Sequence, residues 1–388
     1  MLNKSLFSLT LLALSGLFWS LFNSPPPTRF KLSPAPLSGN TTPVYQAGFA
    51  SHQSTPEVHS ATAVELVDQR VMAFWYGGTR EGHKDVSIYS NIWDPQTGQW
   101  GQDREIINRP FTRDSTYRYI RKLGNPVVMR WPDQGLWLFY VSVSVGGWAG
   151  SAINLSRSYD EGQTWSPARR LITSPFFNLS TLIKGKPIQY QDGTIGLPVY
   201  HEMLGKFAEL LRINQDGEVI DKTRLSWGTH SLQPIVFITS EDNALVMMRY
   251  HGSGLRRILQ TRTRDAGQSW SPVSRSELPN PNAGIIGLNI QWQGQDALLL
   301  AFNNSEEERD DLSLALSLNR GQSWQIISTI ELNPLDPPNN SKQFSYPWLL
   351  QTRNGQIHLF YTWHKSHIKH IVFNQSWLEQ QLAQMKKP

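Results

Sequence analysis

Three short segments repeat a carboxylate or amide, a glycine two residues later and a tryptophan three residues beyond it. They read SYDEGQTW (158–165), TRDAGQSW (263–270) and SLNRGQSW (317–324). Asp160 and Asp265 could belong to a catalytic loop, a metal loop or a structural turn. The third copy has Asn319 instead of a carboxylate, and three copies of one catalytic acid would be unusual. Because Asp and Asn accept hydrogen bonds from turn backbone and Gly supplies positive φ, we interpret the repeat as a structural turn.

The other residue types that commonly bind metals or cofactors do not show a suitable spacing. The chain has no Cys, which excludes disulfides, thiolate zinc sites and a cysteine nucleophile. His364, His367 and His370 are three residues apart, but YTWHKSHIKHIVF is typical of two strands joined by a tight turn, not of a helix. No Gly-rich loop follows a strand and opens a helix. We therefore expect no metal and no cofactor.

The elements that carry these residues are short strands separated by turns. Runs such as VMAFWYGG, GLWLFYVSVSV and NALVMMRYHG alternate or are rich in aromatic residues. Asp265 follows Asp160 by 105 residues, Asn319 follows after 54 more, and degenerate copies lie at 212–219 (RINQDGEV) and in WDPQTGQW, which ends at Trp100. A repeat of about 50 residues with several strands is the signature of a propeller blade. The pattern predicts an all-β, six-bladed β-propeller over residues 45–375, whereas a pair of β-sandwiches would not explain the repeat.

The two ends of the chain differ from this pattern. One Lys and a mostly apolar run, Leu6 to Phe22, precede three prolines, which is the pattern of an N-terminal apolar helix that acts as a signal sequence or membrane anchor. We divide the chain into this segment (1–23), a Pro-rich spacer (24–44), the propeller (45–375) and a short helical tail (376–388). We expect export to the periplasm or cell surface, with residues 5–23 either cleaved or retained in the membrane.

The charge pattern favours a small acidic ligand. The net charge is +5, and Lys and Arg are scattered rather than gathered in a basic helix or arm. Nucleic-acid binding is therefore not expected, and we expect a monomer.

The repeated motif resembles the Asp boxes of the sialidase (neuraminidase) superfamily of six-bladed propellers. WYGGTREGHKDVSIY, LPNPNAG and QFSYPWLLQT are similar to its bacterial and plant BNR-repeat, sialidase-like branch. The resemblance extends over roughly residues 45–375. It implies three arginines that hold a substrate carboxylate, a tyrosine nucleophile with a carboxylate beside it as base, and a separate acid/base residue.

Three residues match that site. Tyr346 lies where the resemblance places the nucleophile, although an aromatic residue next to Pro347 would otherwise suggest core packing. Arg249, which ends an apolar strand, resembles the second arginine. Arg309 resembles the third, although EEERDD could equally be a solvated charge cluster.

Two positions depart from it. His59 lies where the first arginine is expected, so the grip on a carboxylate would be weaker or pH-dependent. Gln233 stands in place of the base, and an amide cannot take the proton of Tyr346. Glu202 in PVYHEM is the candidate replacement.

The acid/base residue has two candidates in one loop, Arg80–Asp85. Glu81 has the better positional match, and Asp85 is the alternative or a structural partner of Arg80 or Lys84. Loops are where such residues are usually displayed.

Other residues could contact a sugar or could be structural. Lys186 and Lys369 could replace the missing arginine, and Arg80 could add to the positive charge. Asn280 and Asn282 could bind hydroxyls or build a turn. The aromatic candidates for stacking on a sugar, or for core packing, are Trp148, Tyr361 and Trp363.

These observations predict an exported glycoside hydrolase that releases a terminal acidic sugar, such as sialic acid or a related keto-acid sugar, with retention. Two alternatives remain open. One is a carbohydrate-binding propeller without catalysis, favoured by Gln233 and His59. The other is a glycosidase or lyase with altered acidic-sugar specificity.

Overall fold

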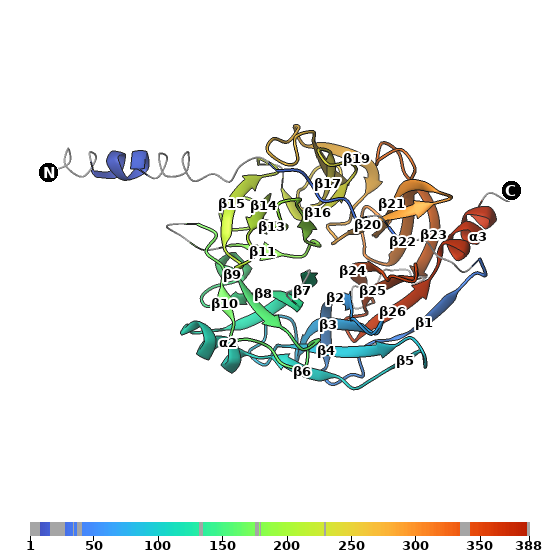
Figure 1. Cartoon of the computed structure of the whole chain (residues 1–388), viewed down its shortest axis with the longest axis horizontal. Coiled ribbons are helices and arrows are strands. Elements are labelled where there is room, and N and C mark those ends of the chain that lie inside the picture. Colours follow the sequence, from blue (N-terminus) through green and yellow to red (C-terminus); the bar gives the residue numbers. More distant parts are fainter. Residues whose placement is uncertain are drawn as a thin grey trace.

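Six antiparallel sheets surround a common centre (Figure 1), which confirms the predicted six-bladed β-propeller. The computed structural model describes residues 8–15, 28–33, 35–36, 41–131, 135–174, 178, 180–228, 230–333 and 342–385. The strands are rich in Val, Ile, Leu and aromatic residues because both faces of most sheets are buried between neighbouring blades.

Each sheet is one blade, and its strands run outward from the centre in chain order, except that β1 is the outermost strand of blade 6. Blade 1 contains β2 (Glu57–Glu65), β3 (Val71–Gly78), β4 (Ser87–Asp94), β5 (Gln99–Trp100) and β6 (Arg104–Ile107). Blade 2 contains β7 (Lys122–Trp131), β8 (Gly135–Val143), β9 (Ser151–Ser158) and β10 (Arg169–Arg170). Blade 3 contains β11 (Leu182–Ile183), β12 (Ile188–Gln189), β13 (Ile195–His201), β14 (Phe207–Ile213) and β15 (Val219–Arg224).

The second half of the propeller repeats this order. Blade 4 contains β16 (Ser231–Ile238), β17 (Ala244–Tyr250), β18 (Arg257–Thr263) and β19 (Ser274–Pro279). Blade 5 contains β20 (Ile286–Trp292), β21 (Gln295–Phe302), β22 (Asp311–Ser317) and β23 (Gln325–Leu332). Blade 6 contains β24 (Phe344–Gln351), β25 (Ile357–Trp363), β26 (His367–Phe373) and β1 (Tyr45–Phe49).

The two ends of the propeller sequence close the ring in blade 6. Strand β1 pairs with β26 in register from Tyr45 opposite Phe373 to Phe49 opposite Lys369. Helix α3 (Gln375–Met385) follows, and Trp377 stacks on Tyr45 with ring centroids 4.8 Å apart. Figure 1 shows β1 beside β26, with α3 next to them. A second helix, α2 (Arg109–Thr116), lies between blades 1 and 2 in sequence and was not predicted.

A recurrent bulge shapes the inner strands near their first residues. In four blades one residue at this bulge has positive φ: Ser60 (56°), Asn125 (44°), Gln233 (50°) and Tyr346 (52°). In blade 3 the same place is a break between β11 and β12, and in blade 5 Asn282 (58°) precedes β20. Because a bulge bends a strand and re-aims a side chain, this level of the propeller is suited to building a site.

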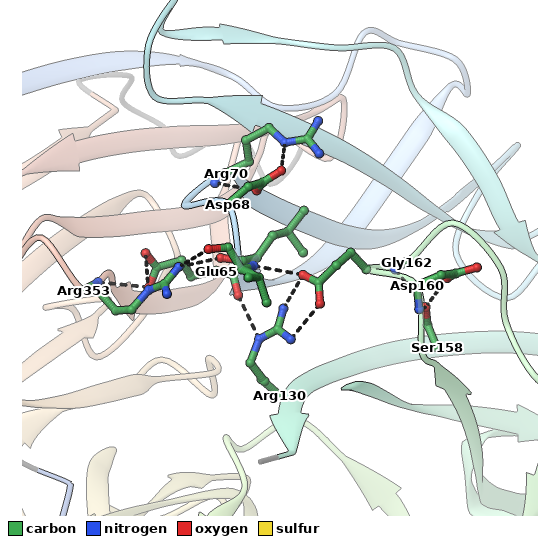
Figure 2. Close-up of polar contacts among 11 residues, drawn as sticks. Glu65, Asp68, Arg70, Arg130, Ser158, Asp160, Gly162 and Arg353 are labelled. Atoms are coloured by element: carbon green, nitrogen blue, oxygen red, sulfur yellow. Dashed lines mark hydrogen bonds and ion pairs between the residues drawn. The ribbon is translucent and has the colours of Figure 1, made fainter. Parts of the chain in front are cut away.

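The repeated motif forms the turn between the third and fourth strands of blades 2, 4 and 5, on the face where the inner strands end. Asp160 Oδ1 accepts a hydrogen bond from Ser158 Oγ at 2.8 Å, and Gly162 beside them adopts φ of 84° (Figure 2). Asp160 Oδ1 also accepts from Thr164 N at 2.9 Å. Asn319 Oδ1 accepts from the backbone N–H four residues later at 2.9 Å. These are the contacts of a structural turn, remote from the bulges.

Part of the predicted spacer lies against the propeller. Phe30 is fully buried, its N–H donates to Glu241 O at 2.8 Å, and its ring packs 5.2 Å from that of Tyr190. Arg29 forms an ion pair with Glu241 at 3.1 Å. Of the predicted signal or anchor at 5–23, only residues 8–15 are described, and they are helical. No helix in the described ranges is long and apolar enough to cross a membrane.

Candidate functional site

Arg249 connects three residues at the centre of the propeller. It lies at the end of β17, and its Nε donates to Asn282 Oδ1 at 2.7 Å. Its Nη1 donates to Gln233 Oε1 at 3.3 Å and to the Tyr346 hydroxyl at 3.4 Å. Residues from blades 4, 5 and 6 therefore meet around one guanidinium, as the sequence predicted for Tyr346 and Arg249.

Arg309 approaches Tyr346 from another side. Its Nη2 donates to Asn282 O at 2.6 Å, its Nη1 donates to Gln343 Oε1 at 3.3 Å, and its guanidinium carbon lies 5.9 Å from the Tyr346 ring centroid. Asn282 thus holds both arginines, one through its side chain and one through its carbonyl. Two guanidinium groups in this arrangement suit a carboxylate ligand, because their planar N–H groups match its geometry.

Gln233 is fixed in a hydrogen-bond chain that reaches Tyr200 and Asn125. Gln233 Oε1 faces Arg249, which can only donate, so its Nε2 donates to Tyr200 Oη at 3.4 Å. Asn125 Nδ2 donates to the same hydroxyl at 3.3 Å, and burial raises the pKa of Tyr200, which therefore stays neutral. The amide is thus an integral part of the site rather than a disordered substitute for a carboxylate.

Sequence reasoning missed Asn125 and Tyr200. A usable signal was present, because Asn125, Gln233 and Tyr346 each occupy the positive-φ position of a bulge and each precedes a proline. Lys186, in the break of blade 3, also precedes a proline.

His59 contacts Tyr346 but does not replace the missing arginine as a cation. The two rings meet edge to face with centroids 4.6 Å apart, and His59 Nδ1 lies 3.1 Å from Thr362 Oγ1. Burial lowers the pKa of His59 well below its usual value, and the positive charges of Arg309 and Lys365 lower it further. His59 is therefore neutral at pH 7, which corrects the expectation of a pH-dependent cation.

Of the two candidate acids, Glu81 lies toward this cluster. Its carboxylate is 3.9 Å from His59 Nε2, too long for a hydrogen bond. Burial raises the pKa of Tyr76, and the charge of Glu81 raises it further. Tyr76 in turn meets the His59 ring edge to face at 5.7 Å, so Glu81 borders the group that surrounds Tyr346.

Asp85 instead anchors its own loop. It accepts hydrogen bonds from Thr79 N at 3.1 Å and Thr79 Oγ1 at 2.5 Å, and it lies 2.6 Å from His83 Nδ1. The Thr79 hydroxyl lowers the pKa of Asp85 to about 2, and His83 contributes to the same effect. Its partners are thus Thr79 and His83, not Arg80 or Lys84, and a carboxylate held ionised is a poor acid.

Glu202 lies near the site without contacting the tyrosine. It follows β13, and its N–H donates to Ser180 Oγ at 2.8 Å. Burial raises the pKa of Glu202, and the charge of Arg249 partly offsets this rise. Within the described part of the chain, no carboxylate forms a hydrogen bond with the Tyr346 hydroxyl.

The aromatic candidates and Lys369 have structural contacts. The Tyr361 side chain is fully buried and its hydroxyl donates to Glu331, which also pairs with Lys369. Trp363 packs on the His364 ring with centroids 3.7 Å apart. Tyr361 thus follows the core-packing alternative, and Lys369 is already paired with a carboxylate. Trp363 is half-buried with one ring contact, so its role in stacking on a sugar stays a prediction.

The structure supports the turn-building alternative for Asn280 and leaves the expected roles of Arg80 and Lys186 as predictions. Asn280 is buried and builds a turn, since its side chain accepts from Tyr250 N at 3.3 Å and donates to Ala283 O at 3.0 Å. Arg80 is exposed, and its guanidinium has no hydrogen bond among the described residues. Lys186 is half-buried in the break of blade 3, and burial lowers its pKa. Only Lys186 among these three remains close to the level of the bulges.

In the part of the chain that the structure describes, no group of three or more His, Asp or Glu residues is placed to hold a metal ion. The cluster around Tyr346 itself consists of two arginines, the tyrosine, a carboxylic residue at its border and neutral amides.

The fold is similar to those of several solved structures. The Hadza microbial sialidase Hz136 aligns with a TM-score of 0.67 at 16% identity, covering 84% of this chain and 68% of that chain. The intramolecular trans-sialidase from Ruminococcus gnavus, in complex with oseltamivir carboxylate, aligns with a TM-score of 0.63 at 14% identity, covering 85% and 97%. A protein of unknown function from Dyadobacter fermentans aligns with a TM-score of 0.67 at 10% identity, covering 85% and 99%. At these identities the likeness concerns the fold.

Sequence comparison adds the family. A search of curated proteins found no match. The model of the BNR repeat-like domain matches residues 69–359, which is most of the chain. The chain therefore belongs to the family of proteins with a BNR repeat-like domain.

Proposed function

We propose that this protein is a sialidase-like glycoside hydrolase that acts on a terminal acidic sugar. The observation that carries the proposal is that Arg249 and Arg309 both lie beside Tyr346 and are both held by Asn282. A sugar with a carboxylate at its anomeric carbon would bind its anionic group to these arginines. Its anomeric carbon would then lie beside the Tyr346 hydroxyl.

The proposed reaction has two steps. Glu81 donates a proton to the leaving-group oxygen while Tyr346 oxygen bonds to the anomeric carbon, and the glycosidic bond breaks. Glu81 then takes a proton from water as the water displaces Tyr346, so the product keeps the anomeric configuration. A tyrosine suits this role because a carboxylate nucleophile would be repelled by the sugar's own carboxylate.

The first step also requires an acceptor for the Tyr346 proton. Gln233 lies beside the tyrosine and cannot accept a proton, so we assign this role to Glu202, whose pKa is raised by burial and whose charge interacts with Arg249. The same observation favours a second candidate function, namely a propeller that binds acidic sugars without cleaving them. An N-terminal segment that directs export would bring either activity to extracellular glycans.

One experiment separates these functions. The purified protein is incubated with a panel of terminal sialosides and other keto-acid glycosides, and ¹H NMR follows the anomer first released. Release with retention that Tyr346→Phe abolishes supports the hydrolase, with the exposed Tyr159→Phe as matched control. Full turnover by Tyr346→Phe, or an inverted product, refutes the tyrosyl mechanism. Binding without product formation supports the second candidate.

A further inference from the structure

A buried lysine spans the centre of the propeller beneath the candidate site. Lys184 lies in the break between β11 and β12 of blade 3 and is 0% exposed. Its Nζ donates to Pro347 O of blade 6 at 3.2 Å and lies 5.2 Å from the ring centroid of Trp348. Blades 3 and 6 are opposite each other in a ring of six, so this side chain crosses the axis.

The same segment supports the two bulges that carry the key side chains. Pro347 follows Tyr346, and Lys184 holds its carbonyl. Gly185 lies so close to blade 4 that a Cβ there would come within 2.1 Å of Pro234 O, the residue after Gln233. Lys184 and Gly185 thus form the floor below Tyr346 and Gln233.

The charge of this lysine has no counter-ion among the described residues. The ionisable groups that line this part of the site are His59 (β2), Tyr200 (β13), Arg249 (β17), Tyr346 (β24) and Lys186 in its own segment. Carboxylates also occur on these elements, at the two ends of β2 and directly after β13, but the pKa of Lys184 is lowered by burial with no opposing contribution from any of them. The charge of Lys184 also contributes to lowering the pKa of His59, so the site experiences its field.

Burial lowers the pKa of Lys184 to about 7, so the amine is partly neutral at physiological pH. The hydrogen bond to Pro347 O persists in both forms because a neutral amine still donates an N–H. A change in protonation therefore alters the electrostatic field of the floor while the bond to the Tyr346 bulge remains.

We propose that Lys184 is a positioning residue that couples acidic-sugar binding to the uptake of one proton. A buried, unpaired ammonium group is costly, and an anion held by Arg249 and Arg309 above it reduces that cost. The bound carboxylate thus favours the charged lysine, and the charged lysine favours the bound carboxylate. This inference rests on the proposed recognition of an acidic sugar, but does not require catalysis.

The direction of the pH effect follows from linkage. An anion raises the pKa of Lys184 in the complex above its value in the free protein, so the complex holds more protons between the two values. Affinity should fall as pH rises through this window, by at most about tenfold per pH unit for one proton. Below the lower value the affinity should be independent of this group.

Titration calorimetry with 2,7-anhydro-Neu5Ac, an acidic sugar whose carboxylate is its one group that titrates below pH 9, tests the coupling. Measurements at pH 7.5 in buffers of different ionisation enthalpy give the number of protons taken up on binding, and for the wild type this should be a fraction of one proton per ligand. The Kd of the wild type should also rise from pH 7 to pH 8.5. The neutral methyl ester of the same probe should bind without proton uptake. Lys184→Met should lose the proton uptake and the pH dependence, whereas Lys222→Met, which removes a surface lysine near Glu209, should keep both.

The outcomes are distinguishable. Wild-type binding without proton uptake overturns the inference even if Lys184→Met does not fold, and leaves the proposed function intact. If Lys184→Met takes up as many protons as the wild type, the proton binds to another group, and the inference about Lys184 is also overturned. If the wild type binds neither this probe nor a sialoside, the proposed function fails and the inference fails with it.

Discussion

The Arg249 guanidinium donates to the Tyr346 hydroxyl at 3.4 Å through the same nitrogen that donates to Gln233 at 3.3 Å. The Arg249 cation is therefore placed to bind a substrate carboxylate next to Tyr346. A group that accepts the tyrosine proton would be needed at the same place, where Gln233 lies. Gln233 contributes no charge, and Arg249 forms no ion pair among the described residues, so its guanidinium is available for an anionic ligand.

Replacing Arg249 tests the clamp. Arg249→Lys removes the Nε–H that binds Asn282 and the planar group that can grip a carboxylate, so we expect affinity for a sialic acid ligand to fall about 30-fold, within the range for hydrogen bonds to charged groups. Calorimetry with the acid and with its neutral ester measures this. Arg262→Lys, on the outer part of the same blade, should leave both affinities unchanged. Equal losses for acid and ester would argue against a carboxylate clamp.

Restoring a base should increase catalysis. Gln233→Glu places a carboxylate where the amide oxygen lies 3.3 Å from Arg249, next to the Tyr346 hydroxyl. We expect kcat for sialoside hydrolysis to rise about 100-fold, the usual contribution of a general base. Gln233→Met, of similar size but unable to accept a proton, serves as the control and should not gain activity. No gain in Gln233→Glu, despite unchanged ligand affinity, would mean that Tyr346 is not the nucleophile.

Glu81 and Asp85 should respond differently to removal of their charge. We expect Glu81→Gln to lower kcat about 100-fold or more for a poor leaving group, and less for an activated one such as nitrophenol. Asp85→Asn should leave kcat largely unchanged and lower the melting temperature, because Asp85 anchors Thr79 and His83. The pKa of Asp85 is about 2 in the folded protein, which is lower than in the unfolded chain. The stabilisation by its carboxylate is therefore complete above the pKa of the unfolded chain and is lost as pH falls through about 2. Loss of kcat in Asp85→Asn alone would reverse the assignment.

The fold could be predicted because the repeat depends on local chemistry. A turn with Asp160 or Asn319 depends only on its own backbone and a glycine, so the motif can be recognised in the sequence. The distance between its copies then indicates the number of blades. Tyr346, Arg249 and Arg309 could be located because the resemblance assigns them to particular strands of that repeat.

The rest of the site depends on distances between blades. Tyr361 and Lys369 are cross-strand partners, but their shared contact with Glu331 of the neighbouring blade appears only in the folded structure. The charge of His59 is set by its burial near Arg309, and Lys184 acquires its role only because blade 6 lies across the axis. A sequence gives the residue types but not these separations.

The turn motif should matter for stability and not for catalysis. Asp160→Ala removes acceptors for Ser158 and Thr164 in an exposed turn, so we expect the free energy of unfolding to fall by about 1 kcal/mol, with kcat and ligand affinity unchanged. Urea denaturation measures this. Asn319→Asp, which restores the carboxylate of the other two copies, should not destabilise the protein. A specific loss of activity in Asp160→Ala would return the motif to the candidate catalytic residues.

The stability of the closing blade should depend on pH through a pair of buried histidines. His358 Nδ1 lies 2.9 Å from His370 Nε2, both side chains are almost fully buried, and the His370 ring stacks on Phe360 with centroids 4.4 Å apart. Burial lowers the pKa of His358 to about 3, and it lowers that of His370 well below its usual value. Both rings are therefore neutral in the folded protein, while an unfolded chain would protonate them near pH 6.5.

Between pH 6.5 and about 3 the unfolded state thus binds more protons, so stability should fall as the pH is lowered through this window, by up to about 1.4 kcal/mol per pH unit for each histidine. Above pH 6.5 this contribution is constant. Equilibrium unfolding in urea from pH 7.5 to 4.5 should show the decline, and the double variant His358→Gln, His370→Gln should have a shallower slope even if its stability at pH 7.5 is lower. His230→Gln, at an exposed position, should keep the wild-type slope. A double variant with the wild-type slope would mean that carboxylates, and not this buried pair, determine the acid sensitivity of the ring closure.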